Sequence, residues 1–319
     1  MDKREYKERY KAQQKYTNEE LKRLQALPLD EKIALSKVRI QEWYEYWQGK
    51  VFVSYSGGKD STVLLKLIRE MYSEVAAVYV DSGLDFPEIR EHVKQTENVI
   101  RLKPSMTFRE VLTKYGWLFP SKKVARCIVD YKRGTPYAQM YMEGKNYDGS
   151  PSPFNVSRYA KWKWLVDAPF PISDKCCKII KEKPLTKYST DSGCKPMNGT
   201  MASEGGRRKD AWLITGCNAF DMKNPISKPL SFWTEQDILR YIVDNGVEIP
   251  TVYGEIVEEK GRLTTTGEKR TGCMFCLIGC HLNKPNRFQS MKETHPNIYK
   301  YCMEQLGLEE VLTWLKIPH

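Results

Sequence analysis

The chain has 319 residues, of which 41% are hydrophobic and 12% aromatic, which excludes a disordered polypeptide and allows one large core or two. Lysine and arginine outnumber aspartate and glutamate by 51 to 40, and the net charge of +11 suits a polyanionic partner or a plain solvated basic surface. The chain starts with charged residues and contains no run of about 18 apolar residues, so we expect neither a secretory signal nor a membrane span. These features predict a cytoplasmic protein whose nine cysteines are thiols, metal ligands or redox centres.

Residues 1–48 are predicted to form an N-terminal helical extension. Thr17 with Glu20 three positions later has the pattern of a capping box, and helical spacing of apolar residues resumes after Pro28 and stops at Gly49. No residue in these helices is specific for a ligand. They are a candidate surface for a partner or a homodimer.

Residues 49–250 are predicted to form one α/β domain, because short apolar strands alternate with helical patterns. This alternation predicts a mostly parallel sheet wound on both faces. The predicted strands are 51–55, 74–83, 98–104 and 210–219, and the predicted helices are 61–72, 86–96, 107–116 and 234–246. Within this domain, residues 116–171 are interpreted as an insertion or a lid, and residues 251–319 follow as a cysteine-rich and helical C-terminal region.

A glycine-rich turn in VFVSYSGGKDSTVLL, residues 51–65, carries the most specific signal. Gly57 and Gly58 allow a turn after the strand whose N–H groups point into one space. Asp60 begins a helix whose positive end faces that space, and Lys59 is expected to add a mobile charge at the exposed edge of the sheet. The turn predicts a pyrophosphate-sized anion site that is not a Walker P-loop. The candidate nucleotide-binding residues here are Ser54, Tyr55, Ser56, Gly57, Gly58, Lys59, Asp60 and Ser61.

The SGGKDS segment, residues 56–61, resembles the PP-loop of the adenine-nucleotide alpha-hydrolase superfamily. The resemblance implies a doubly wound, five-stranded parallel sheet that binds ATP or a related adenylyl nucleotide and usually cleaves it between the α and β phosphates. It also implies Lys59, Asp60 and Ser61 as catalytic residues. Lys59 would stabilise the charge that develops on departing pyrophosphate, and Mg²⁺ would share that role.

Three further segments resemble the phosphoadenosine phosphosulfate (PAPS) reductase family. Residues 78–93, VYVDSGLDFPEIREHV, are similar to its D-T-G-x-x-F-P-E segment, and residues 175–185, KCCKIIKEKPL, to C-C-x-x-x-K-x-x-P-L. Residues 199–220 are similar to a G-x-R-A-x-E-S-x-x-R run, although Met201 replaces the first arginine and Gly205 the serine. The resemblance implies nucleotide or substrate contacts from Val80, Asp81, Ser82, Gly83, Glu204, Arg207 and Arg208.

The segment RTGCMFCLIGCH places three thiols at C-x2-C-x3-C, and thiolates at this spacing suit an iron–sulfur cluster or Zn²⁺. In the adenylyl-sulfate branch of the resembled family, a Cys-Cys pair and a later C-x-x-C hold a four-iron, four-sulfur (4Fe-4S) cluster. Adjacent cysteines reach different irons more easily than one metal ion, which favours the cluster over zinc. The resemblance implies Cys176, Cys177, Cys273 and Cys276 as ligands, with Cys280 as an alternative ligand or a reactive thiol.

Three functions are compatible with these patterns. We favour an ATP-using enzyme that adenylates a substrate for sulfur transfer, with tRNA or DNA as candidate acceptor and a sulfur-donor protein as a further candidate partner. The alternative is a sulfonucleotide reductase that attacks PAPS or adenylyl sulfate with a cysteine and releases sulfite. Such reductases usually lose the pair corresponding to Lys59 and Asp60, and Cys302 lacks the E-C-G-x-H context of their nucleophile. A nucleotide-binding regulatory component without turnover is the third alternative.

Overall fold

A computed structural model describes residues 12–319, and the chain divides into two compact units. Unit 1 holds the described residues up to 81 together with 85–103 and 184–271, and unit 2 holds 82–84, 104–183 and 272–319. The predicted division at residues 48 and 250 does not coincide with these units, because the N-terminal helices belong to unit 1. Residues 1–11 of the predicted extension lie outside the described residues. None of the helices described is both long and apolar enough to cross a lipid bilayer.

Unit 1 is built on a six-stranded sheet with the strand order β3-β2-β1-β4-β6-β5. Every neighbouring pair is parallel except β5 with β6 at one edge, so the predicted, mostly parallel α/β fold is confirmed with one strand more than the resemblance implied. Val53 lies opposite Ala77 on one side and Met197 on the other. The strands are β1 (Val51–Tyr55), β2 (Ala77–Val80), β3 (Val99–Leu102), β4 (Lys195–Met197), β5 (Asn218–Ala219) and β6 (Ile226–Ser227).

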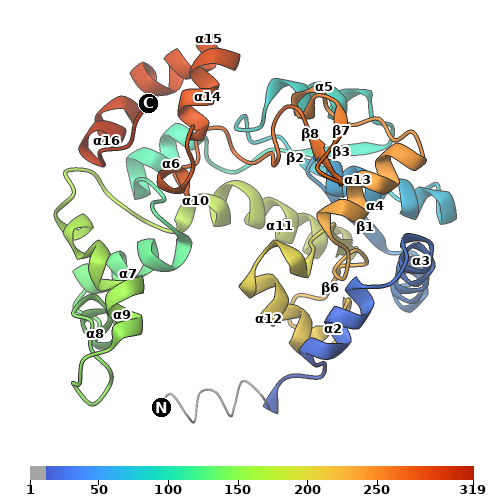
Figure 1. Cartoon of the computed structure of the whole chain (residues 1–319), viewed down its shortest axis with the longest axis horizontal. Helices are drawn as coiled ribbons and strands as arrows, with labels where there is room; N and C mark the ends of the chain where they lie inside the picture. Colours follow the sequence, from blue (N-terminus) through green and yellow to red (C-terminus); the bar gives the residue numbers. More distant parts are fainter. Residues whose placement is uncertain (1–11) are drawn as a thin grey trace. The chain divides into compact units, whose positions relative to one another are not determined.

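Helices cover both faces of this sheet because successive strand residues point to opposite sides. Val53 and Tyr55 belong to the core that also contains residues of α3, α4 and α13, and Figure 1 shows α13 beside α4. Phe52 of the other face packs edge-on against Tyr188 of α11, with ring centroids 5.1 Å apart. The helical segments are α2 (Asn18–Gln25), α3 (Leu29–Tyr46), α4 (Lys59–Met71), α5 (Pro87–Gln95), α11 (Lys183–Ser192), η3 (Ala202–Glu204), α12 (Gly206–Thr215), α13 (Glu235–Asp244) and η4 (Thr251–Tyr253).

The predicted helix starts in unit 1 are confirmed at two places. Thr17 and Glu20 form the capping box of α2, and Thr234 with Asp237 forms that of α13. Lys32 of α3 is buried and donates to Asp237 Oδ2 at 2.7 Å. The N-terminal helices are therefore fastened to the α/β core through the cap of α13.

One predicted strand is wrong. The structure places most of residues 210–219 in helix α12, and only Asn218–Ala219 form a strand. Trp212 and Leu213 are both buried against the core from this helix, which explains their continuous apolar pattern. The fourth parallel strand is instead Lys195–Met197, which the sequence did not reveal because it is short and contains a proline. A hairpin of β7 (Ile256–Glu259) and β8 (Arg262–Thr265) was also not predicted.

Unit 2 is helical in the residues that the structure describes. The segment expected to be an insertion or a lid, residues 116–171, forms α7, α8, α9 and η1, which lie together in Figure 1. The segments of unit 2 are α6 (Phe108–Tyr115), α7 (Lys122–Lys132), α8 (Pro136–Met142), α9 (Pro153–Arg158), η1 (Ala160–Asp167), α10 (Lys175–Cys177), η2 (Lys178–Glu182), η5 (Cys280–Leu282), α14 (Arg287–Thr294), α15 (Pro296–Lys300), η6 (Tyr301–Gln305) and α16 (Leu308–Trp314).

Candidate functional site

The PP-loop lies at the point where the connections of the sheet diverge. β1 has β2 on one side and β4 on the other, so the chain leaves the carboxyl ends of β1 and β4 in different directions. In open α/β sheets this switch point forms a crevice that binds ligands. Residues 56–58 after β1 and Asn198, Gly199 and Thr200 after β4 border it.

Two glycines allow the tight backbone packing at this crevice. Gly57 has φ +72°, and a Cβ there would lie 2.6 Å from Val93 Cγ2 and 2.9 Å from Ile89 Cγ2. A Cβ on Gly199 would lie 2.8 Å from the carbonyl oxygen of Asp60. The loop after β4 therefore approaches the first turn of α4 more closely than any side chain would permit.

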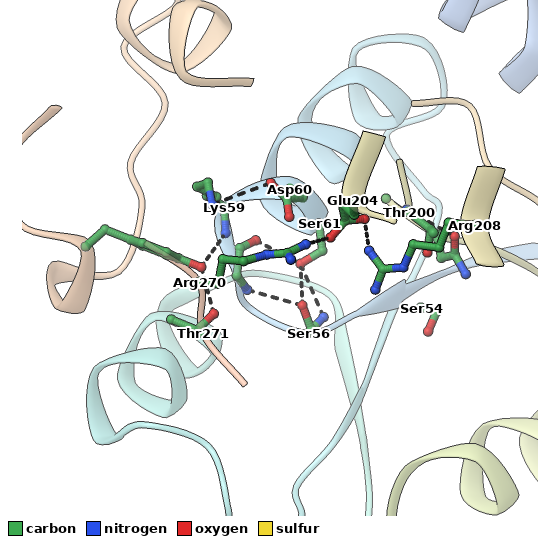
Figure 2. A pocket seen from close by; sticks show the side chains of 14 residues that line it. Ser54, Ser56, Lys59, Asp60, Ser61, Thr200, Glu204, Arg208, Arg270 and Thr271 are labelled. Atoms are coloured by element: carbon green, nitrogen blue, oxygen red, sulfur yellow. Dashed lines mark hydrogen bonds and ion pairs between the residues drawn. The ribbon is translucent and has the colours of Figure 1, made fainter. Parts of the chain in front are cut away.

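A cavity of about 480 Å³ opens at the crevice within unit 1, and Figure 2 shows the side chains around it. It has the size of an ordinary small-molecule site. Its walls come from the PP-loop, the loop after β4, the start of α12 and the segment around residues 253–271. The lining residues are Ser54, Ser56, Gly58, Lys59, Asp60, Ser61, Asn198, Gly199, Thr200, Glu204, Arg208, Tyr253, Arg270 and Thr271.

Lys59 is buried rather than mobile at an exposed edge, so that expectation is corrected. Lys59 is only 3% exposed, and its Nζ donates to the carbonyl oxygen of Lys269 at 2.8 Å. Glu235 Oε1 lies 3.4 Å from the same Nζ, and the ammonium lies 5.2 Å from the centroid of the Tyr253 ring. Its charge is held by the protein because burial without such partners would be costly.

The hydroxyl and carboxyl groups of the PP-loop line the cavity floor. Ser56 Oγ lies 3.0 Å from Ser61 Oγ, which also donates to the carbonyl oxygen of Gly58 at 2.9 Å. Among the described residues, Asp60 Oδ1 has no hydrogen-bond partner, and its ion-pair partner is Lys59 Nζ at 3.9 Å. Burial raises the pKa of Asp60, and the nearby positive charges of Lys59 and Arg270 oppose this effect. A carboxylate oxygen in this condition is a suitable ligand for a hard cation.

Two arginines from distant segments meet at one carboxylate. Glu204 Oε2 contacts Arg208 Nη1 of α12, and Glu204 Oε1 contacts Arg270 Nη2. Glu204 also accepts the N–H of Met201 at 2.9 Å, which fixes its side chain. Burial and the neighbouring guanidinium of Arg270 lower the pKa of Arg208. Glu204 thus holds two guanidinium groups together at the cavity.

Several residues implied by the sequence do not line the cavity. Tyr55 is buried in the core with its hydroxyl near Thr62 and Thr96, and Asp81 forms an ion pair with Arg90 at 3.4 Å. Gly57 forms the turn, and Val80 is buried in its strand. Arg207 is exposed on α12, and Ser82 and Gly83 belong to unit 2.

The cavity also contains residues that the sequence analysis missed: Asn198, Gly199, Thr200, Tyr253, Arg270 and Thr271. The first three follow a strand that its proline concealed. The Lys-Arg-Thr run before Cys273 was an available signal, because a basic pair beside a hydroxyl residue is typical of anion sites. Tyr253 gave no signal, since a single aromatic residue after a helix is usually part of a core.

The thiols implied as metal ligands gather in unit 2. Cys176 and Cys177 lie on α10, and Cys273 and Cys276 lie on a turn closed by the Cys276 N–H and the Cys273 carbonyl oxygen at 3.1 Å. Burial raises the pKa of Cys176 above its usual range, and the charges of Cys177, Cys273 and Cys276 raise it further. Cys280 lies near Cys276, and burial raises the pKa of Cys280 to about 12.

This donor set fits a soft metal centre chemically, since thiolates bind iron and zinc after losing their protons. Burial raises the pKa of Cys276, and the positive charges of Arg287 and Lys181 beside it oppose this effect. Within residues 12–319, however, no three Cys, His, Asp or Glu side chains form a group that could hold a single metal ion. The thiols are therefore neighbours that are not arranged around one ion.

The fold and the cavity define a doubly wound α/β protein with a PP-loop at its switch point. The sequence matches the phosphoadenosine phosphosulfate reductase domain over residues 50–128 and 131–284. The chain therefore belongs to the PAPS reductase family of the PP-loop superfamily.

Individual relatives are more distant. An uncharacterized protein of Methanocaldococcus jannaschii is 21% identical over 277 residues, which cover 84% of this chain and 51% of that protein. A second uncharacterized protein of the same organism is 35% identical over 83 residues, which cover 24% of this chain and 17% of that protein. The chain thus spans about half the length, or less, of these relatives. A crystal structure of PAPS reductase from Candida auris, in complex with phosphate, aligns with 13% identity and a TM-score of 0.40 over 77% of this chain and 97% of that chain.

Proposed function

We propose that this protein binds ATP or a related adenylyl nucleotide in the PP-loop cavity and cleaves it between the α and β phosphates to adenylate a substrate for sulfur transfer. The observation that carries the proposal is the single polar cavity that joins the PP-loop, the start of α4 and two arginines. Polar donors at a helix start are suited to phosphates, and the cavity also contains a carboxylate for Mg²⁺.

The residues have distinct roles in this reaction. The N-terminal end of α4 and the hydroxyls of Ser56, Ser61 and Thr200 hold phosphate oxygens, and the carboxylate of Asp60 would hold Mg²⁺. A substrate oxygen attacks the α-phosphorus, and the bond from that phosphorus to the bridging oxygen breaks, so pyrophosphate leaves with its electron pair. The two arginines contribute positive charge that stabilises the leaving group, and Lys59 holds the segment that carries Arg270. A sulfur nucleophile then displaces AMP from the adenylated substrate.

The thiols of unit 2 hold the second component of the proposal, a 4Fe-4S cluster. Sulfurs that bind one zinc ion at about 2.3 Å must crowd together, whereas a cluster accepts thiols at wider spacing. Cys176 and Cys177 are adjacent, and adjacent thiols reach different irons of a cluster more easily than one zinc ion, which favours the cluster over Zn²⁺. A cluster ligated by three of these thiols would supply an open iron where transferable sulfur is held. The net charge of +11 favours tRNA or DNA as the acceptor, with a donor protein delivering the sulfur.

The reductase alternative receives less support from the structure. Cys302 is the thiol nearest the C-terminus, and it is buried in η6 with its S–H directed at the carbonyl oxygen of Tyr299 at 3.2 Å. Burial raises the pKa of Cys302 to about 12, so almost none of it is the nucleophilic thiolate at neutral pH. A regulatory nucleotide-binding role would leave the carboxylate of Asp60 in this cavity without a catalytic use.

Anaerobically purified protein incubated with radiolabelled ATP and, separately, with PAPS or adenylyl sulfate tests the proposal. We expect AMP and pyrophosphate from ATP in the presence of an acceptor RNA or DNA pool. Asp60→Asn should lower this rate about 100-fold through loss of the metal ligand, while Asp210→Asn, an exposed carboxylate on α12, should not. Sulfite release from the sulfonucleotides would replace the proposal with the reductase, and tight ATP binding without either product would replace it with the regulatory role.

A further inference from the structure

The cations of the PP-loop cavity are not equivalent. Lys59 directs its ammonium at the carbonyl oxygen of Lys269 and at Glu235. Arg208 and Arg270 share one carboxylate, that of Glu204, and each guanidinium reaches it through one nitrogen. Among residues 12–319 neither guanidinium has another hydrogen-bond or ion-pair partner. Two guanidiniums thus face the cavity with the carboxylate of Glu204 between them, and Asp60 lines the same cavity and interacts with both. The N–H donors that Glu204 does not use suit an anionic ligand.

Arg270 is held in place by the PP-loop itself. On one side of it, Lys59 Nζ binds the carbonyl oxygen of Lys269 at 2.8 Å. On the other side, Thr271 Oγ1 lies 2.7 Å from the hydroxyl of Tyr253, which accepts the N–H of Lys59 at 3.2 Å. The residues before and after Arg270 are therefore both tied to residue 59. An exposed side chain fixed at both backbone neighbours loses less conformational entropy when it binds a ligand.

Glu204 gives the pair its geometry. Its side chain is 10% exposed and is anchored by the N–H of Met201, so it cannot swing away when a ligand enters. Figure 2 shows Arg208 and Arg270 reaching Glu204 from different segments, with Ser56 below them. Each guanidinium has five N–H donors in a planar fork, so the donors not used on Glu204 remain for phosphate oxygens.

We infer that Arg208 and Arg270, bridged by Glu204, form a subsite for the terminal phosphate of a nucleoside triphosphate, and that Lys59 is a positioning residue for it. The serines and the N-terminal end of α4 take the inner phosphates, and the paired guanidiniums take the outer, dianionic one. This inference rests on the proposed function, because it specifies which nucleotide the same cavity prefers. It assigns the selection of triphosphate to Arg270, which reaches the cavity from beyond the β7–β8 hairpin.

Calorimetric titration of the full chain with ATP, ADP, AMP and adenosine 3′,5′-bisphosphate tests the subsite. Arg270→Gln should weaken the affinity for ATP about 10- to 100-fold, as expected for a lost charge-assisted pair of hydrogen bonds. The affinity for AMP should change by less than about twofold. Arg262→Gln, which removes the same charge from the exposed strand β8, should leave ATP affinity unchanged. Equal losses for ATP and AMP, or a loss confined to the 3′,5′-bisphosphate, would overturn the assignment to a terminal phosphate.

Different binding results would contradict the proposed function and the subsite. Wild-type protein that binds none of these nucleotides would defeat the proposed function. Wild-type protein that binds ATP with the same affinity as Arg270→Gln would defeat the subsite alone.

A double-mutant cycle tests the positioning role of Lys59. Lys59→Met keeps the apolar stem over Tyr253 and removes the ammonium that holds Lys269. If Lys59 acts through residues 269–271, Lys59→Met weakens the affinity for ATP in the wild-type background. In the Arg270→Gln background it lowers that affinity by less than about a further twofold. Additive losses would show that Lys59 contacts the phosphate directly and would overturn its positioning role. Thermal melting of each variant confirms that the comparison is made between folded proteins.

Discussion

The phosphate cavity of unit 1 and the thiol group of unit 2 differ in how far the polypeptide alone completes them. In the cavity, Lys59, Ser61 and Glu204 already have protein partners at hydrogen-bonding distance. In the thiol group, burial and neighbouring thiolates raise the pKa of Cys176, so the side chains disfavour their own reactive form. A phosphate site can be built in advance from amides, hydroxyls and guanidiniums, whereas a soft-metal site reaches its final geometry only with its metal.

The largest effect should come from removing one thiol of this group. Cys276→Ser should abolish the visible iron–sulfur absorbance of anaerobically purified protein and most of its bound iron, because the oxygen of serine is a poorer ligand for iron. Cys127→Ser, a buried thiol of α7 in the same unit, should keep both. Iron content and absorbance are measured together. Colourless wild-type protein with one equivalent of zinc would show that the thiols bind zinc and not an iron–sulfur cluster.

The next effect concerns the backbone of the PP-loop. Gly57→Ala should lower the free energy of unfolding by about 2–4 kcal/mol, since a positive φ costs roughly 1–2 kcal/mol and overlap with Val93 and Ile89 adds a similar amount. Gly261→Ala is the matched control, because Gly261 has φ +75° but no atom within 4 Å of a Cβ. Urea unfolding of both variants separates the cost of φ from that of contact. Equal losses would show that the loop can move away from α5.

A smaller effect distinguishes two neighbouring arginines on α12. Arg208→Gln should weaken the affinity for ATP about tenfold because Arg208 faces the cavity, whereas Arg207→Gln should weaken this affinity less than about twofold. Both changes remove one charge, so general electrostatic attraction is the same in the two variants. Calorimetry at two salt concentrations checks this expectation. A larger loss in Arg207→Gln would favour the contact that the sequence resemblance implied.

The smallest effect is a dependence of stability on pH at the back of the PP-loop. Burial lowers the pKa of His92, with a weaker opposite effect from Glu248. Its Nε2 lies 3.4 Å from Thr62 Oγ1, which donates to the carbonyl oxygen of Gly58 at 3.1 Å. In the unfolded chain His92 has the ordinary histidine pKa of about 6.5, so near this pH the unfolded state binds more protons than the folded state. The free energy of unfolding should therefore fall as the pH drops from about 7.5 to 5.5.

His92→Gln should reduce this loss of stability, and urea unfolding at both pH values measures it. A variant that loses stability on acidification as strongly as the wild type would exclude His92 as the cause.

The sequence predicted most of the fold and one wall of the cavity. Alternating strands and helices, the capping box at Thr17, the helix start at Thr234, and the glycines after β1 all depend on local patterns, and the structure confirms them. The opposite wall depends on contacts between distant segments. Arg270 reaches Glu204 across 66 positions, and no local pattern encodes such an approach. Residues 210–215 were misread because a buried helix and a buried strand share continuous apolar residues.

The β7–β8 hairpin begins and ends at nearly the same place. Tyr253 before it and Thr271 after it are joined through their side chains at 2.7 Å, and the Gly267 N–H donates to the Tyr253 carbonyl oxygen at 2.9 Å. Because these contacts join the two ends of the hairpin, the length of the hairpin can change without changing the cavity wall formed by Tyr253 and Thr271. The turn at Lys260 and Gly261 is accordingly a permissive point for grafting an epitope or a fluorophore.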